Sequence, residues 1–520
     1  MPDATPTLMS PPEALAVLAD AMSRSPPLDS RVLLHELDRI EPDASPPEEW
    51  LLPGTALCSE IAAALGGWPP QPPATAQDFA RCAAALQRLD RWHRPLLPSE
   101  TGLPRQIEHE MLLDRMALED RFNANPDYGT VIARQAFGSP FLRLDAAEPD
   151  WDAVPSAYGV LCSLLDICVF LPVSVEAGDP DTDSSIEGSR RIGLTFRRFS
   201  PEEPGLPWPP DMLRIALAPV VETEDDARFW VEGDRYAIEP TVPFARFEAL
   251  IQGALAAHAH FLLLPEMTVD SSHLPRLTET LRNLRRAAAH ADRARLPDLR
   301  LALIGVIEAP RVAGGPHRNY IAAISGNGEI LFTQDKLSHW NLDAGAQSRF
   351  GLDGKGFPVP LRENTIAGTN IMVAEFDGIG RVMALICADM SRNMPGDWIA
   401  DNIGLDWLYA PIMDGSTCWL QGRAPWIVHR AVRTCTRAGT TVMIANSMAM
   451  THWNNRVIAR HKADPSYPYR TYEACGIGFI ARREGLETVI QHIKVELGTR
   501  HTPVLQIIDW STGWNAPPAT

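Results

Sequence analysis

Beyond residue 212, short runs of apolar residues alternate with segments whose apolar residues recur at helical spacing. The run 261–264 (FLLL) is apolar at every position, which is typical of a strand buried on both faces of a sheet. The segment 244–258 instead places its apolar residues three and four apart, which predicts a helix. This order predicts a large mixed sheet covered by helices, an α/β fold. The strands expected from the pattern are 214–221, 261–264, 301–306, 320–324, 329–332, 371–376, 382–386, 407–410 and 441–445.

The first 175 residues are rich in Ala and Leu and are broken by clusters of proline, which predicts a mainly α-helical domain. Two helix starts are marked by the spacing of a capping box, in which side chains satisfy free backbone amides. We expect the apolar stripes of two helices to face a core, and no group of residues here indicates catalysis. The capping pairs are Ser10 with Glu13 and Thr75 with Asp78, and the stripes are Phe79, Cys82, Leu86 and Leu89, then Ile107, Met111 and Leu118.

A change of composition marks the boundary between two domains. Residues 176–211 are rich in Asp, Glu, Gly, Ser and Pro, which is typical of a linker or long loop, with one possible strand at 191–199. A chain of 520 residues also exceeds the usual size of one hydrophobic core. We therefore predict a helical domain at 1–175, a linker at 176–211, an α/β domain at 212–510 and a tail at 511–520.

The overall charge narrows the class of partner. The formal net charge is −18, which argues against a general binder of nucleic acid, because such binding depends on neutralising phosphates with Lys and Arg. The one apolar segment long enough to suggest a membrane span, 158–175, is interrupted by Asp166 and Pro172. We expect it to be a buried helix that runs into a strand, and we predict no membrane association.

The eight cysteines and the first residues favour a cytoplasmic protein. The cysteines form no CxxC pair and no grouping with histidine at zinc-ligand spacing, so we expect free thiols, a reducing compartment and no metal. The N-terminal residues MPDATPTLMSPPEAL lack the basic and apolar regions of a secretory signal.

Three apolar runs in the α/β half lead into chemically reactive residues. The first reaches Glu266, the second reaches Lys336 and the third reaches Cys387. A single cysteine in such a place is more often inert core than nucleophile. Because the carboxyl ends of strands are the usual ligand-binding edge of α/β sheets, the three residues together predict one site.

The motifs LLLPE, DKLSH and ICAD, in that order, resemble the nitrilase superfamily of carbon–nitrogen hydrolases. The resemblance covers roughly residues 212–510 and includes the strand pair in HRNYIAAISGNGEIL and the helix of 425–438 before TTVMIANS. It implies a four-layer αββα sandwich, in which two mixed sheets are flanked by helices. It also implies a homodimer or higher homo-oligomer, no cofactor, and hydrolysis of an amide, carbamoyl or nitrile bond.

The chemistry of the three residues agrees with this resemblance. Attack on an amide or nitrile carbon needs a thiolate, and a free cysteine is mostly protonated at pH 7. Glu266 can take the proton of Cys387, deliver it to the departing nitrogen and then activate water. Lys336 can stabilise the thiolate and the developing oxyanion, together with the backbone amide of Ala388.

Other residues near the motifs are expected to support the site. The resemblance implies that Glu363, followed by Gly368, orients Lys336 or the substrate. Asp389 is expected to hold the turn after the cysteine. We expect His339 to be structural or to line the pocket, which Trp340, Met413 and Asp414 would also line.

Three features depart from the pattern of the family. Ala388 stands where relatives carry a bulky residue and would widen the pocket floor, and Arg437 replaces an acidic residue in the helix before the last strand. The long Gly-rich segment 341–362 could form a lid. These departures leave the substrate open.

Two alternatives to a hydrolase remain from the sequence. The same site could transfer the acyl group to an amine or alcohol, as an acyltransferase. The α/β half could also be a scaffold or regulator without catalysis, whose helical N-terminal domain binds a protein partner. Retention of Glu266, Lys336 and Cys387 favours the enzyme.

Overall fold

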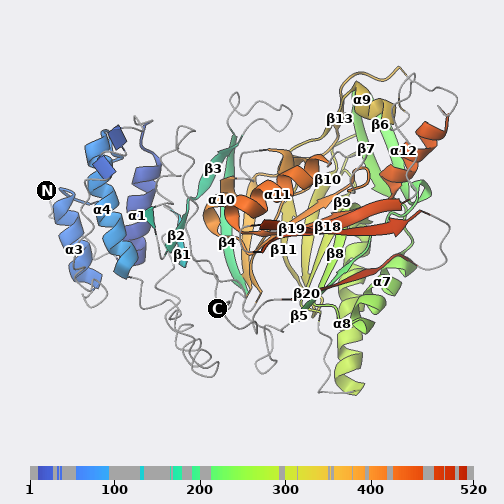
Figure 1. Ribbon diagram of the computed structural model, residues 1–520, viewed down its shortest axis with the longest axis horizontal. Helices are drawn as coiled ribbons and strands as arrows, with labels where there is room; N and C mark the ends of the chain where they lie inside the picture. The colour runs from blue at the N-terminus through green and yellow to red at the C-terminus, as the bar shows by residue number, and fades with distance from the viewer. Residues whose placement is uncertain are drawn as a thin grey trace. The chain divides into compact units, whose positions relative to one another are not determined.

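The chain divides into two compact units, residues 1–175 with 401–404, and residues 176–400 with 405–520 (Figure 1). The computed structural model describes residues 10–26, 32–33, 36–37, 54–68, 70–92, 129–133, 164–165, 168–177, 190–199, 212–291, 299–312, 314–349, 352, 356–376, 379–392, 398–417, 425–460, 474–484, 487–497 and 503–511. In that part of the chain, no helix is both long and apolar enough to cross a membrane.

The described residues of the first unit include helices α1, α3 and α4 and a small sheet. Both predicted capping boxes are present: the Glu13 carboxylate accepts a hydrogen bond from the Ser10 amide at 2.9 Å, and Thr75 Oγ1 accepts one from the Asp78 amide at 3.1 Å. The stripe that begins at Phe79 is buried, as predicted, whereas the predicted helix around Met111 lies outside the described residues. The elements are α1 (Pro11–Ser23), α3 (Gly54–Ala64), α4 (Ala76–Trp92), β1 (Thr130–Ala133) and β2 (Cys168–Leu171).

The antiparallel pair β1–β2 adds a sheet that the helical pattern of this region did not predict. Strand β2 is the strand expected near the end of 158–175, and most of the helix expected before it lies outside the described residues.

One sheet of the second unit has six strands in the order β11-β10-β9-β8-β5-β20. Strands β5, β8 and β9 are parallel to one another, and the other pairs are antiparallel, so the sheet is mixed. One face of the sheet shares a core with helices α7 (Phe244–Ala256) and α8 (Leu274–Ala291). The strands are β11 (Ile330–Asp335), β10 (Arg318–Ser325), β9 (Leu301–Glu308), β8 (Phe261–Asp270), β5 (Met212–Leu217) and β20 (Gln506–Ser511).

A second sheet has eight strands in the order β19-β18-β17-β16-β15-β14-β4-β3. It is also mixed, and helix α11 (Trp426–Ala438) packs on it through buried residues that include Val428 and Cys435. The strands are β19 (Glu487–Glu496), β18 (Ala474–Glu484), β17 (Thr441–Asn446), β16 (Trp407–Ile412), β15 (Gly380–Ala384), β14 (Asn370–Phe376), β4 (Arg190–Phe199) and β3 (Ser174–Ala177).

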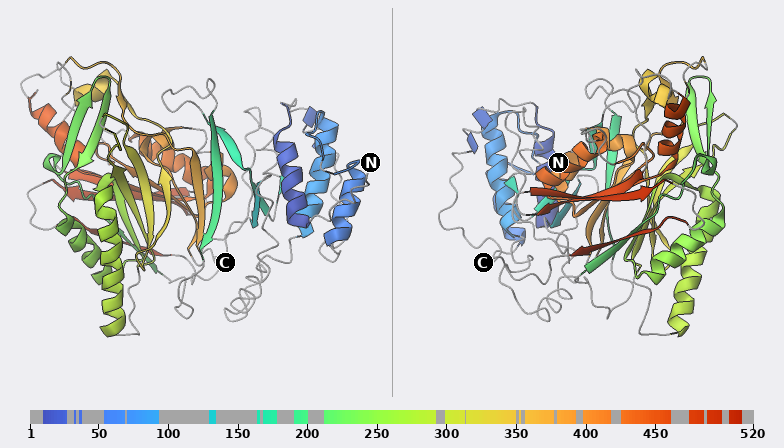
Figure 2. Two further views of the ribbon diagram at one scale, coloured as in Figure 1. Left: turned by 180° about the vertical axis from the view of Figure 1, so that it is seen from behind. Right: turned by 45° about the vertical axis from the view of Figure 1, so that its right-hand side comes forward.

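The two sheets contact each other through alternate residues of their central strands. The rings of Phe261 in β8 and Trp407 in β16 meet edge to face with centroids 5.7 Å apart, and the Tyr409 hydroxyl donates to the Leu264 carbonyl at 2.5 Å. Figure 2 shows α7 and α8 on one side of the strands and α11 on the other. The second unit therefore has the predicted α/β class, with mixed sheets.

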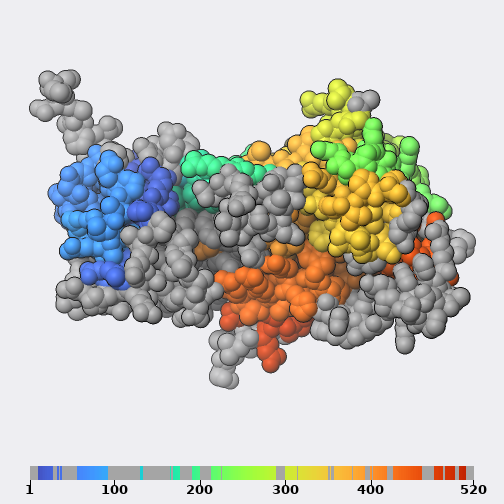
Figure 3. All heavy atoms as spheres, turned by 90° about the horizontal axis from the view of Figure 1, so that it is seen from above, coloured from blue at the N-terminus to red at the C-terminus, as the bar shows by residue number. Residues whose placement is uncertain are grey.

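A third, four-stranded sheet in the order β12-β13-β7-β6 was not predicted, because its strands are short and mix polar with apolar residues. Strand β13 pairs in parallel with β7 although more than a hundred residues separate them, and their segments adjoin at one end of Figure 3, in gold and green. The strands are β12 (Asn341–Leu342), β13 (Leu361–Glu363), β7 (Arg235–Pro240) and β6 (Ala227–Glu232).

Two details of the sequence prediction are corrected. The possible strand at 191–199 is β4, which pairs in parallel with β14, so this part of the predicted linker belongs to the eight-stranded sheet. The predicted tail begins one residue early, because Ser511 is the last residue of β20.

Candidate active site

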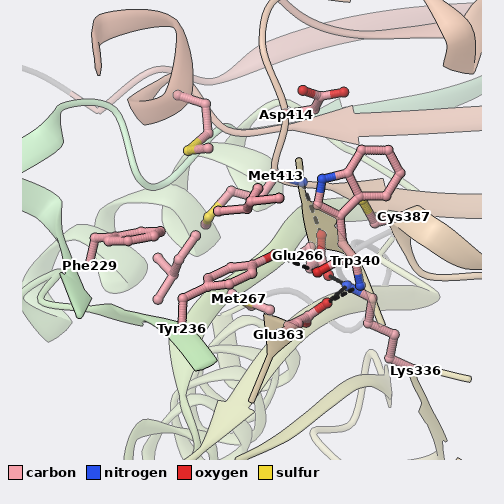
Figure 4. A pocket seen from close by; sticks show the side chains of 13 residues that line it. Phe229, Tyr236, Glu266, Met267, Lys336, Trp340, Glu363, Cys387, Met413 and Asp414 are labelled. Atoms are coloured by element: carbon pink, nitrogen blue, oxygen red, sulfur yellow. Dashed lines mark hydrogen bonds and ion pairs between the residues drawn. The ribbon is translucent and has the colours of Figure 1, made fainter. Parts of the chain in front are cut away.

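Four elements of the second unit bring the predicted catalytic residues to one cavity (Figure 4). Glu266 lies within β8, Lys336 directly follows β11, and Glu363 ends β13. Cys387 follows β15 as the first residue of a 3-10 helix, η6 (Cys387–Ser391). The structure thus brings together residues that are up to 121 positions apart in the sequence.

Glu266 does not follow the end of its strand, as the sequence suggested, but lies in an irregularity within it. The pairing of β8 with β9 shifts register between Leu264 and Val269, where Pro265 has no N–H to donate. The absence of a side chain at Gly305 permits this path, since a Cβ there would lie 2.0 Å from the Pro265 carbonyl oxygen. Met267 completes the distortion with a φ of +52°. This bulge directs the Glu266 carboxylate out of the sheet.

The ammonium of Lys336 lies between two carboxylates. Its Nζ is 2.8 Å from Glu266 Oε1 and 2.6 Å from Glu363 Oε2, and all three side chains are at most 2% exposed. Asn319 Nδ2 donates to Glu266 Oε1 at 2.8 Å. Asn319 Nδ2 also lies 3.4 Å from Glu363 Oε1, and two backbone amides donate to the carboxylates, with Met413 N 3.1 Å from Glu266 Oε2 and Trp340 N 2.9 Å from Glu363 Oε2. Charge pairing and hydrogen bonds together offset the large cost of burying these charges.

The electrostatics of this group keep the lysine charged. Burial alone lowers the pKa of Lys336, but Glu266 and Glu363 raise it by more, so its pKa lies well above the usual value. Burial raises the pKa of Glu266, and Lys336 opposes that shift. The result is a fixed positive charge beside a carboxylate that accepts a proton more readily than an exposed one.

Cys387 occupies a strained position at the start of η6. Its φ is +45°, which is unfavourable for a residue with a Cβ, and its side chain is 6% exposed. Burial raises the pKa of the thiol well above its usual value, Glu266 raises it further, and Lys336 opposes both. The thiol is therefore protonated at neutral pH, and a base has to take its proton before it can attack carbon.

Asp389 joins the cysteine turn to the loop that carries Lys336. Its carboxylate accepts hydrogen bonds from the backbone amides of Leu337 at 3.1 Å, Ser338 at 2.7 Å and Ile386 at 3.1 Å. Burial raises the pKa of this carboxyl to about 7 against those three donors. The residue thus fixes the position of Cys387 relative to Lys336 without lining the cavity itself.

The raised pKa of Asp389 predicts a pH-dependent contribution to stability. Because the folded pKa of about 7 exceeds the unfolded value of 3.8, the folded state binds this proton more tightly. The stabilisation is complete below about pH 4 and is lost as the pH rises through about 7. Relative to Asp389→Asn, the unfolding free energy of the wild type is expected to fall by roughly 3–5 kcal/mol over that range. Urea unfolding midpoints at several pH values measure this.

Asp225 supplies the control, since Asp225→Asn makes the same change of charge at an exposed side chain. Its midpoint is expected to follow the wild type at each pH. If the urea unfolding midpoints of the wild type and Asp389→Asn changed in parallel with pH, the three amide donors would be keeping the carboxylate ionised throughout.

The cavity above these residues is small and largely apolar. About 30 Å³ is open to the centres of water molecules. Its walls come from the six-stranded sheet, the small sheet, η6, the loops after β11 and β16, and helix α12 (Ala449–Arg460). The lining residues are Phe229, Tyr236, Ile238, Glu266, Met267, Lys336, Trp340, Leu342, Glu363, Cys387, Met413, Asp414 and Met450.

The predicted pocket residues divide into two groups. Trp340, Met413 and Asp414 line the cavity, whereas His339 and Ala388 do not. Ala388 is buried in η6, where its carbonyl accepts a hydrogen bond from Ser391 Oγ at 2.7 Å. The wider pocket floor expected from its small side chain stays a prediction.

The segment predicted as a lid contributes to the cavity wall. Its described residues include β12 and helix α9 (Ala344–Arg349), and Leu342 both lines the cavity and packs into the buried core with Ala346 and Leu352.

Two polar contributors to the site, Asn319 and Tyr236, were not identified from the sequence. Asn319 is the second residue of β10, which runs antiparallel to β9 and β11, so the first residues of β10 lie beside the last residues of its neighbours. A buried Asn at that end of an apolar strand is the signal that could have indicated it. Tyr236 comes from the unpredicted small sheet and donates its hydroxyl to the Trp340 carbonyl at 3.0 Å. Trp426 donates Nε1 to Asp414 Oδ2 at 2.8 Å.

No protein-family model matches the sequence, and no curated protein matches it. Solved structures of nitrilase-superfamily and carbon–nitrogen hydrolase proteins match part of the chain. A carbon–nitrogen hydrolase from Helicobacter pylori G27 matches at 10% identity and a TM-score of 0.34, over 58% of this chain and 90% of its own. The NitFhit protein of Caenorhabditis elegans matches at 14% identity and a TM-score of 0.35, over 58% of this chain and 62% of its own. A mutant amidase from Nesterenkonia sp. AN1, with a covalent adduct at its active-site cysteine, matches at 15% identity and a TM-score of 0.32. The match covers 59% of this chain and 94% of the amidase chain.

Proposed function

We propose that the second unit is a carbon–nitrogen hydrolase of the nitrilase superfamily, acting on a small amide, carbamoyl compound or nitrile. The observation that carries the proposal is the placement of a buried cysteine in the same cavity as an ammonium held by two carboxylates. The contacts between the two sheets, with helices on both outer sides, support the four-layer αββα sandwich that the motifs implied.

The first half of the proposed reaction forms an acyl-enzyme. Glu266 takes the proton of the Cys387 thiol as sulfur bonds to the substrate carbon. For an amide, the carbonyl oxygen gains negative charge, which the Lys336 ammonium and the Ala388 amide stabilise. The C–N bond then breaks, and Glu266 returns the proton to the departing nitrogen. The products of this half are an amine and a thioester on Cys387.

The second half returns the enzyme to its starting state. Water enters where the amine left, and Glu266 takes one of its protons as the oxygen attacks the thioester carbon. The C–S bond breaks, the acid departs and the proton returns to sulfur. Glu363 holds Lys336 in place throughout and touches no reacting atom, so it is a positioning residue. These steps use no cofactor.

Mass spectrometry of the intact protein tests the proposal. The protein is incubated with a panel of small amides and nitriles and quenched in acid, and the modified peptide is mapped. We expect release of ammonia or amine and a mass increase of one acyl group at Cys387. Hydroxylamine in the mixture should yield a hydroxamate at the expense of the acid, since it competes with water for the thioester. An absence of turnover and adducts, with Cys387 inert to iodoacetamide, would refute the proposal.

A further inference from the structure

The charge of the cavity is not balanced. Three carboxylates, Glu266, Glu363 and Asp414, line it against the single ammonium of Lys336, a formal charge of −2 among its described lining residues. Lys336 already forms ion pairs with the first two carboxylates. Asp414 is thus a negative charge in the cavity that no described cation pairs with.

Asp414 is held in place by neutral donors. Its Oδ2 accepts from Trp426 Nε1 at 2.8 Å and its Oδ1 accepts from the Gly415 amide at 2.7 Å. Asn446 holds the backbone on both sides, because its Oδ1 accepts from the Asp414 amide at 3.0 Å and its Nδ2 donates to the Gly415 carbonyl at 2.6 Å. Neutral donors orient the carboxylate without cancelling its charge.

Asp414 also lies near the reacting sulfur. After burial and Glu266, its charge is a further contribution that raises the pKa of the Cys387 thiol. In Figure 4 its carboxylate stands apart from the group formed by Glu266, Lys336 and Glu363, with Cys387 and Trp340 between them. A substrate carbon bonded to Cys387 would therefore have the proposed catalytic carboxylate on one side and Asp414 on another.

The other walls of the cavity suit a positive charge. The indole of Trp340 stacks on that of Trp426 with centroids 5.9 Å apart, and the rings of Phe229 and Tyr236 stack at 5.5 Å. Trp340, Phe229 and Tyr236 all line the cavity. Aromatic faces attract cations, and a carboxylate among them completes the usual surroundings of an ammonium or guanidinium ligand.

We infer that the cavity selects substrates that carry a positively charged nitrogen, which binds Asp414, and rejects substrates that carry a carboxylate. This inference names the substrate class of the hydrolase and rests on the proposed function. Since a charge-assisted hydrogen bond typically discriminates by roughly 10–100-fold, the preference for a cation over a neutral analogue is expected in that range.

Two measurements test the inference, one of which does not require turnover. In the first, kcat/KM is compared for three amides of similar length: 4-aminobutanamide, pentanamide and succinamic acid. In the second, the rate at which methanethiosulfonates modify Cys387 is mapped by mass spectrometry, using the 2-aminoethyl, methyl and 2-sulfonatoethyl reagents. Each forms a mixed disulfide with the thiolate and releases methanesulfinate. Each rate is divided by that for 2-mercaptoethanol, a thiol with no other charged group, which corrects for the intrinsic reactivity of the reagent.

We expect the cationic compound to be favoured in both series and the anionic one to be the poorest. Asp414→Asn should reduce the cation preference by roughly 10-fold or more, Asp414→Glu should retain much of it, and Asp225→Asn should leave it unchanged. Equal reactivity of the three reagents in the wild type overturns the inference even if Asp414→Asn fails to fold. If no amide is hydrolysed but the cationic reagent still reacts fastest, the hydrolase proposal fails and the charge selectivity stands.

Discussion

Replacing Cys387 by alanine is expected to lower kcat/KM for the best amide substrate by roughly 10⁴–10⁶-fold, the range found when a catalytic nucleophile is removed. The expected loss is large because the proposed acyl-enzyme is a thioester, and Cys387 is the one thiol among the described residues that line the cavity. Stability should change little, since the substitution removes one sulfur atom that packs beside the cavity. Steady-state kinetics together with thermal unfolding measure both effects.

Cys435 provides the matched control. It is a free cysteine, fully buried in α11 and outside the cavity, so Cys435→Ala removes the same atom from a packed core. We expect it to lower stability by about 1–2 kcal/mol and to leave kcat/KM within a few-fold of the wild type. Retention of more than a hundredth of the activity by Cys387→Ala would mean that the cysteine is not the nucleophile.

The parts of the site that were predictable from the sequence are those that follow short apolar runs. Strands β11 and β15 are short apolar or alternating segments whose ends are marked by Lys336 and Cys387, and each pattern depends only on local residues. The position of Glu266 was less predictable, because the strand continues past Pro265 through a bulge that depends on Gly305 in the neighbouring strand. The sequence of neither strand alone predicts such a close approach between the two.

The cavity walls illustrate the same limit. Tyr236 and Phe229 reach the site from a small sheet that forms only when β7 pairs with β13, and the sequence of either strand is too short and too polar to predict it. Asp389 was expected to support its turn because it stands two residues after Cys387. Asp389 also accepts hydrogen bonds from the backbone amides of Leu337 and Ser338, and these contacts depend on packing across the interface of the two sheets. Local periodicity predicts elements, whereas long-range pairing decides which side chains meet.

Replacing Lys336 by methionine is expected to remove nearly all activity and to destabilise the fold. Methionine is close in length to lysine and fills the same space, but it leaves Glu266 and Glu363 buried without their shared counter-charge. Breaking a buried ion pair in this way typically costs about 3–5 kcal/mol. The loss of oxyanion stabilisation lowers kcat by roughly 10²–10³-fold or more. Urea unfolding and steady-state kinetics measure the two effects.

The destabilisation by Lys336→Met should grow with pH. Lys336 is what opposes the rise in the pKa of Glu266, so its removal raises that pKa further above the unfolded value of 4.5. A folded pKa above the unfolded one gives stability that is complete below about pH 4.5 and is lost as the pH rises through the folded value. The difference in unfolding midpoint between wild type and variant should therefore be larger at pH 8 than at pH 5. Adding Glu363→Gln removes one of the two carboxylates, so the double variant should recover part of the stability and none of the activity. A destabilisation that is the same at both pH values, and unchanged in the double variant, would mean that Lys336 contributes by packing and not by its charge.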